Sequence, residues 1–183
     1  MLFYTEKSTK LFKLNEIELL MERTLVLIKP DGVKRSICGE IISRFEKVGL
    51  KIVGIKMIQP SKEFAEKHYH DVEERHGRKV LEGLSEYMGM GPVIAMVLEG
   101  ASAIKQVRKM VGKTEPLTSE PGTIRGDYTH LSYARADDPN SAVKALYNII
   151  HASANEQDSE HEINLWFSDS ELWEYKLLHE DFF

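Results

Sequence analysis

Three short, mostly apolar runs lie far apart in this chain: Thr24–Ile28 (TLVLI), Val93–Leu98 (VIAMVL) and Ile163–Phe167 (INLWF). Apolar runs of this length, bounded by turn residues, are typical of strands that are buried on both faces of a sheet. The first run ends at Lys29-Pro30-Asp31-Gly32, a strong turn sequence. We therefore expect a sheet that is covered on both sides.

The segments between these runs have mostly helical periodicity. Apolar residues recur at helical spacing in four of them. The first expected helix includes Ile41 and Phe45 and ends at Gly49, and the second begins at the cap Ser61 and reaches about Tyr69. The third covers Val80–Met88, and the fourth runs from Ile104 to Gly112. Lys51–Gln59 alternates as a strand does, and Ser168-x-x-Glu171 is a capping box before a short C-terminal helix. The mixed order of strands and helices predicts one sheet covered by helices and leaves the strand order open.

Composition narrows the class of protein. A chain of 183 residues suits one domain, which we expect over residues 21–183. Residues 1–20 are expected to be either an extension or a short amphipathic helix that docks on the domain. The single Cys38 excludes an internal disulfide and favours a cytoplasmic location. The net charge of −5 makes nucleic acid an unlikely main partner, and no apolar run is long enough to cross a membrane.

Two nucleotide-binding motifs are only partly present and are rejected. Gly112-Lys113-Thr114 matches the end of a P-loop, but the first glycine of that motif is replaced by Val107. Gly89-Met90-Gly91 begins like a dinucleotide fingerprint, but its third glycine is replaced by Ile94. The chain therefore needs another way to hold phosphates.

Several phosphate-seeking groups remain, most of them beside turns. Lys29 ends the first apolar run, and Arg125 lies in the glycine-containing loop Pro121–Asp127 (PGTIRGD). His151 follows a short apolar stretch in Asn148–Ser153 (NIIHAS), and Glu162 could orient one of its ring nitrogens. Taken singly, each residue has an ordinary structural interpretation, because a loop cation is usually solvated and a lone histidine is usually structural.

Together, however, these segments resemble the signatures of the nucleoside diphosphate kinase family. The similarity rests on Thr24–Gly32 (TLVLIKPDG), Pro121–Asp127, and Asn148–Ser153 followed by Glu162–Phe167 (EINLWF), in that order. It extends from about Met21 to about Tyr175. The resemblance implies a ferredoxin-like α+β fold with a four-stranded antiparallel sheet covered by helices, and a homo-oligomer that is a hexamer or a tetramer.

The resemblance also implies a role for each matching residue. His151 corresponds to the histidine that accepts the γ-phosphate of ATP and passes it to a nucleoside diphosphate in a ping-pong reaction. Glu162 corresponds to the carboxylate that holds its ring, and Ser153 to the serine beside that pair. The nucleotide-binding positions are Lys29, which also counts as catalytic, Tyr69, Arg108, Thr114, Arg125 and Asn148.

The chemistry is consistent with these residue types. A neutral imidazole has a free lone pair with which to attack phosphorus, and a carboxylate on its other nitrogen stabilises the cation that forms. Cationic side chains stabilise the charge that spreads over the phosphoryl oxygens. Mg²⁺ is expected to be held by the nucleotide phosphates, without a metal site built from protein ligands.

The chain departs from the family pattern in two places. An aromatic residue commonly stacks on the base, but here the corresponding position, counted back from Gly83, is Val80, with His76 as an alternative. The segment between Asp127 and Asn148 is longer than in many members. One interpretation is that it reshapes the nucleotide site or a subunit contact, and the other is that it is a tolerated surface insertion. A catalytically weak nucleotide-binding or regulatory module of the same fold is the competing interpretation.

Overall fold

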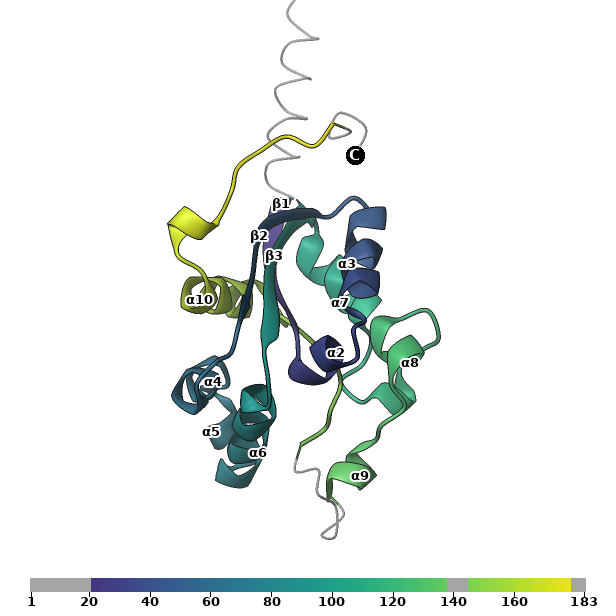
Figure 1. Cartoon of the computed structure of the whole chain (residues 1–183), viewed down its shortest axis with the longest axis vertical. Helices are drawn as coiled ribbons and strands as arrows, with labels where there is room; N and C mark the ends of the chain where they lie inside the picture. Colours follow the sequence, from purple (N-terminus) through teal and green to yellow (C-terminus); the bar gives the residue numbers. More distant parts are fainter. Residues whose placement is uncertain (1–20, 138–144, 179–183) are drawn as a thin grey trace, which may run out of the picture.

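The computed structural model describes residues 21–137 and 145–178, and these form one sheet covered by helices (Figure 1). The strands are β1 (Met21–Ile28), β2 (Lys51–Ile58), β3 (Val93–Ala101) and β4 (Ile150–Ala152), in the order β2-β3-β1-β4. Each neighbouring pair is antiparallel, and β1 pairs with β3 along its whole length. This arrangement confirms the predicted α+β class and its four-stranded antiparallel sheet. The proposed extension over residues 1–20 lies outside the described residues.

Alternate residues of β1 point into two separate cores. Leu25 and Leu27 pack in one core, together with residues of α4 (Lys62–His68), α6 (Arg78–Gly89) and α10 (Glu156–Trp166). Val26 and Ile28 pack in the other, against α3 (Cys38–Lys47) and α7 (Ala103–Val111). Figure 1 shows the two groups of helices on opposite faces of the sheet. The uninterrupted apolar run of β1 therefore reflects burial on both sides.

Short elements complete the chain and mostly follow local signals. They are α2 (Pro30–Lys34), α5 (Val72–His76), α8 (Ile124–Tyr128), α9 (Tyr133–Asp137) and the 3₁₀ turns η1 (Pro116–Thr118) and η2 (Asp169–Glu171). Ser61 caps α4 as predicted, because its hydroxyl accepts a hydrogen bond from the backbone N–H of Phe64. Gly112 ends α7 with φ +88°, a conformation that favours glycine.

One sequence-based prediction was wrong. Ile163–Phe167 was expected to be a strand, but Ile163 to Trp166 form the last turn of α10, and the fourth strand is the three-residue β4 instead. Ile163 and Trp166 are three positions apart and both buried, which is the spacing of one helix face. Within the described residues no helix has the length and apolar character needed to cross a membrane.

Candidate active site

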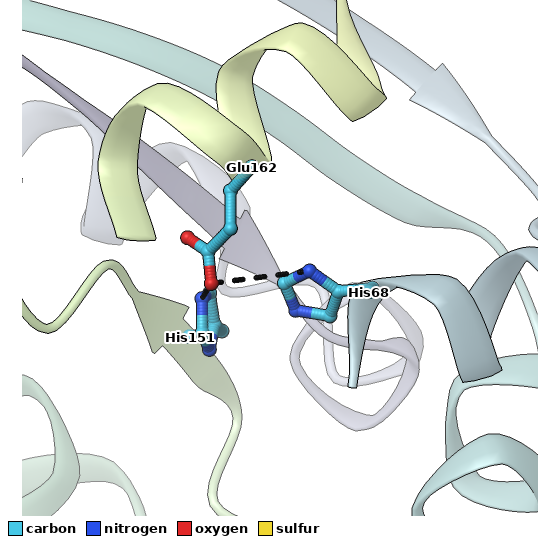
Figure 2. Close-up of side chains that lie close together, drawn as sticks. All are labelled: His68, His151 and Glu162. Atoms are coloured by element: carbon cyan, nitrogen blue, oxygen red, sulfur yellow. Dashed lines mark hydrogen bonds and ion pairs between the residues drawn. The ribbon is translucent and has the colours of Figure 1, made fainter. Parts of the chain in front are cut away.

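His151 lies at the centre of β4, where it pairs with Leu27 of β1. Its ring Nε2 is 2.8 Å from Oε1 of Glu162, which projects from α10 (Figure 2). A carboxylate accepts hydrogen bonds, so this contact assigns the ring proton to Nε2 and leaves the lone pair on Nδ1. The side chain of His151 keeps 20% of its surface exposed, whereas that of Glu162 keeps 9%. The His151 side chain is therefore partly accessible, while its partner is nearly buried.

A second hydrogen bond fixes the Glu162 carboxylate. The hydroxyl of Ser153, which is fully buried, donates to Oε2 of Glu162 at 2.6 Å. The same hydroxyl oxygen accepts from the backbone N–H of Leu25 in β1. Both carboxylate oxygens are thus engaged, so Glu162 cannot turn without breaking a charge-assisted hydrogen bond. This arrangement holds the His151 ring in one orientation.

The backbone that leads to His151 is strained. Ile149 has φ +58°, a left-handed conformation that is a genuine outlier for a β-branched residue. Its carbonyl accepts from the backbone N–H of Lys29 at 2.8 Å, and its N–H donates to Oδ2 of Asp31 at 3.2 Å. Gly32 allows the close approach, because a Cβ at that position would lie 3.2 Å from the Ile149 carbonyl oxygen. The Lys29-Pro30-Asp31-Gly32 turn therefore shapes the histidine strand, and such strain is concentrated at functional sites.

Lys29 is a buried cation beside this turn. Its Nζ donates to Oδ1 of Asn148 at 2.9 Å and lies 5.1 Å from the centre of the Tyr87 ring. Burial, and then the charge of Arg125, lower the pKa of Lys29 to about 7, against a smaller opposing effect of Asp31. Lys29 is therefore poised between its charged and neutral forms near neutral pH.

Arg125 is a second buried cation, and it clamps the backbone around the site. Its guanidinium donates to four carbonyl oxygens, those of Gly112, Lys113, Asn148 and Ile150. Burial, and then the charge of Arg108, lower its pKa to about 10. The Asn148 side chain completes the frame, since its amide donates to the Thr114 carbonyl at 2.9 Å. Lys29, Arg125 and Asn148 are thus joined in one network with the strand of His151.

The remaining predicted positions are placed less tightly. Arg108 and Thr114 are exposed. The charge of Arg108 contributes to the lowered pKa of Arg125, and the backbone carbonyl of Thr114 accepts a hydrogen bond from the Asn148 amide. Val80 keeps 42% of its surface exposed in the first turn of α6. Within the described chain, no hydrogen bond or ring contact connects Val80 to the His151 group.

His68 lies next to His151, and Tyr69 packs against the ring of His68. The sequence interpretation identified only the tyrosine. The Tyr69 hydroxyl is buried without a hydrogen-bond partner, and burial together with the charge of Glu162 raises the pKa of this group. The His68 ring packs against the His151 ring with centroids 4.5 Å apart and planes at 81°. Nothing in the sequence singles out His68, because a single histidine beside Tyr69 carries no metal-ligand spacing.

His68, His151 and Glu162 also form the one cluster of potential metal ligands in the described part of the chain, with ligand atoms within 4.8 Å of one another. Each of the two histidines already has a hydrogen-bond partner that determines which ring nitrogen carries the proton. Nε2 of His151 bonds to Glu162, and Nδ1 of His68 accepts from the indole N–H of Trp166 at 3.3 Å. The donor set contains two nitrogens and one carboxylate, so it does not match the oxygen ligands that Mg²⁺ prefers.

A histidine with a free Nδ1, a carboxylate on its other nitrogen and buried cations beside its strand define a site for transfer of an anionic group, and phosphoryl transfer is the chemistry that requires this combination. The family model described as "NDK: Nucleoside diphosphate kinase" matches residues 22–172. The chain belongs to the nucleoside diphosphate kinase family.

Individual relatives agree with this assignment. A nucleoside diphosphate kinase from Pyrococcus furiosus is 51% identical over 155 residues, which are 85% of this chain and 88% of that protein. "Nucleoside diphosphate kinase III, chloroplastic/mitochondrial" from Arabidopsis thaliana is 50% identical over 85% of this chain, and the match spans 58% of that longer protein. A nucleoside-diphosphate kinase structure from Borrelia burgdorferi, a transition-state mimic with bound vanadate and ADP, superposes with a TM-score of 0.83 at 43% identity, over 88% of this chain and 96% of that one. The predicted family and its phosphotransferase activity are confirmed.

Proposed function

We propose that this nucleoside diphosphate kinase transfers the γ-phosphate of ATP to nucleoside diphosphates through a phosphohistidine at His151. The observation that carries the proposal is the 2.8 Å contact between Nε2 of His151 and Glu162, which leaves Nδ1 as the nucleophile. Nδ1 attacks the γ-phosphorus, the bond to the β–γ bridging oxygen breaks, and ADP leaves. Glu162 stabilises the positive charge that develops on the ring.

The cations have separate tasks in this mechanism. Lys29 and Arg108 neutralise charge on the phosphate oxygens, and Arg125 does so while it also holds the carbonyls that flank His151. Tyr69 offers an unpartnered hydroxyl to a phosphoryl oxygen. Asn148 and Thr114 hold the nucleotide beside Lys29, with Asn148 at the ribose. We assign base contact to Val80, whose exposed aliphatic side chain can cover one face of a base.

We further propose that Mg²⁺ is the divalent cation of the reaction. Asp31, the carboxylate closest to Lys29 in the turn, already accepts from the Tyr87 hydroxyl at 2.6 Å and from the Ile149 N–H. Phosphate oxygens of the nucleotide would therefore be its main ligands, and the ion would offset part of their negative charge. Lys29, Arg108 and Arg125 would bind and orient the same phosphates.

The test is a two-step labelling experiment. The protein is incubated with γ-labelled ATP and Mg²⁺, separated from free nucleotide and then given GDP. Label is expected on His151, stable to base and labile to acid, and it should leave as GTP. His151→Ala should take no label but still bind ATP, whereas His130→Ala, which alters an exposed histidine, should behave as the wild type. A wild-type protein that binds ATP without taking label would refute the proposal and support a binding module.

We also propose a cytoplasmic homo-oligomer, either a hexamer or a tetramer. Support comes from β2, an edge strand on which Ile55 and Met57 expose 52% and 58% of their surface. An apolar edge strand left open would invite aggregation, so a partner subunit is a natural cover. Light scattering after size exclusion should give four or six chains, and a monomer would contradict the proposal. Imaging of the tagged full chain tests its location.

A further inference from the structure

Burial leaves two neighbouring polar groups near His151 without hydrogen-bond partners. Among the described residues only three buried side-chain polar atoms lack a partner, and two of them are Nε2 of His68 and the hydroxyl of Tyr69. The Tyr69 hydroxyl already has a proposed partner in the phosphoryl group. Because an unsatisfied buried donor costs free energy, the exception at His68 needs a physical reason.

The tautomer of His68 is set from behind by Trp166. The indole N–H of Trp166 can only donate, so its 3.3 Å contact with Nδ1 of His68 requires a lone pair on that nitrogen. The ring proton of neutral His68 must then lie on Nε2. Burial, followed by the charges of His151 and Lys29, lowers the pKa of His68 well below its usual value, with smaller effects of His161 and His70. The ring is therefore uncharged at neutral pH.

The edge of the His68 ring that carries Nε2 faces the flat side of the His151 ring. The two centroids are 4.5 Å apart and the planes are nearly perpendicular, and Figure 2 shows His68 edge-on toward the face of His151. An N–H group directed at an aromatic face makes a weak favourable contact, which partly compensates the missing hydrogen bond. The contact is better with a neutral, electron-rich ring than with a cationic one, because the N–H carries partial positive charge.

The opposite tautomer would disturb the site. Nδ1 of His68 lies 4.0 Å from Oε1 of Glu162, the oxygen that binds His151. With its proton on Nδ1, His68 could donate to this carboxylate and compete with His151 for it. The bond from Trp166 prevents this by occupying the Nδ1 lone pair, so the charge of Glu162 stays available to His151.

We propose that His68, held in its Nε2–H tautomer by Trp166, is a positioning residue that orients the neutral ring of His151 and reserves Glu162 for it. The proposal rests on the phosphohistidine mechanism above. His68 acts through His151 and is not assigned any contact with the phosphoryl group. The interaction chain runs from α10 through Trp166 to α4 and from there to β4, so it links three elements around one ring.

The first test is direct and uses the wild-type protein. Long-range ¹H–¹⁵N spectra distinguish the two neutral tautomers of each histidine, and His68 is expected to show its proton on Nε2 and to stay neutral down to acidic pH. A spectrum with the proton on Nδ1 of His68 would overturn the proposal without any mutation.

The second test compares variants in single-turnover phosphorylation by ATP. Trp166→Phe keeps an apolar ring but removes the N–H, and we expect the phosphorylation rate to fall about tenfold, the effect of weakening one charge-assisted hydrogen bond, with little change in ATP affinity. Trp173→Phe alters an indole that is 68% exposed and serves as the matched control. A wild-type rate in Trp166→Phe would contradict the role of the tautomer.

A third variant separates positioning from simple space filling. His68→Phe retains an aromatic edge against His151 without any nitrogen, so it should phosphorylate more slowly than the wild type while its ATP affinity changes little, because the His151 ring loses the N–H contact that orients it. A wild-type phosphorylation rate in His68→Phe would show that only bulk matters. If wild-type protein takes no label on His151, the proposed function fails; if it does and the variants match it, this inference alone fails.

Discussion

The contact between Glu162 and His151 allows a prediction for Glu162→Gln. Glutamine has almost the same shape and can still accept the Nε2–H of His151, so the substitution removes the negative charge and the acceptor for the Ser153 hydroxyl. Oε1 lies 2.8 Å from Nε2, and the carboxylate is mostly buried, so screening by water is limited. Ground-state binding of ATP should hardly change, because the His151 ring is neutral before the reaction.

The expected loss follows from the charge that forms on the ring. Two unit charges about 4 Å apart interact by about 4 kcal/mol at an effective dielectric constant of about 20. Only part of that charge has developed in the transition state, and the amide dipole of glutamine retains some of the interaction, which leaves about 2–3 kcal/mol. The phosphorylation rate should therefore fall about 30- to 150-fold.

Rapid-quench measurement of the first phosphorylation step, over a range of ATP concentrations, separates the rate from the affinity. Glu160→Gln removes the same charge from an exposed position on α10 and controls for net charge. The reasoning would be refuted if Glu162→Gln kept the wild-type rate, or if its defect lay in ATP affinity alone. Unfolding curves should accompany the rates, since Ser153 also loses part of its hydrogen bond to this side chain.

Three further predictions concern the surrounding frame. At pH 8 the buried Lys29, with a pKa of about 7, is mostly neutral, so ATP binding should take up close to one proton as the phosphates restore its charge. Calorimetry in buffers of different ionisation enthalpy measures this proton uptake. The uptake should be absent in Lys29→Met. Gly32→Ala should lower the free energy of unfolding in urea by about 1–3 kcal/mol, because the new Cβ would lie 2.8 Å from Cγ2 of Ile28. Gly39→Ala is the control: the space around this position is open, so the substitution should be neutral or slightly stabilising. Asn148→Leu should cost about 2–3 kcal/mol by the same assay, since it leaves the Lys29 ammonium and the Thr114 carbonyl without their partner, and a smaller loss would mean that water replaces the amide.

The sheet was predictable from sequence because β1 and β3 are buried on both faces and read as uninterrupted apolar runs. The same criterion failed for Ile163–Phe167, where a buried face of a helix end happens to place apolar residues close together. β4 escaped notice because three residues are too few to show any period, although the strand contains His151. Its position depends on pairing with β1, which is a long-range contact with no local signal.

The candidate site was predicted where residues match a family motif. His151, Glu162 and Lys29 were singled out by that resemblance, because taken singly each of them has an ordinary structural interpretation. The partners of Arg125 could not be predicted, because it binds backbone carbonyls. Every residue has a backbone carbonyl, so the sequence does not indicate which ones an arginine binds. His68 was missed for a related reason: its importance comes from an edge-to-face contact and from the proton that Trp166 assigns to it, and neither is visible without coordinates.

The electrostatics of the proposed site help to explain how it would serve two different nucleotides in turn. A shift of the Lys29 pKa from 10.5 to about 7 means that its charged form is about 5 kcal/mol less favourable than in water. Glu162 cannot relieve this, because it is committed to His151 and Ser153. A bound phosphate supplies the missing negative charge, whether it belongs to the nucleotide that donates or to the one that accepts. In the proposed mechanism, recognition is thereby directed at phosphates and not at the base.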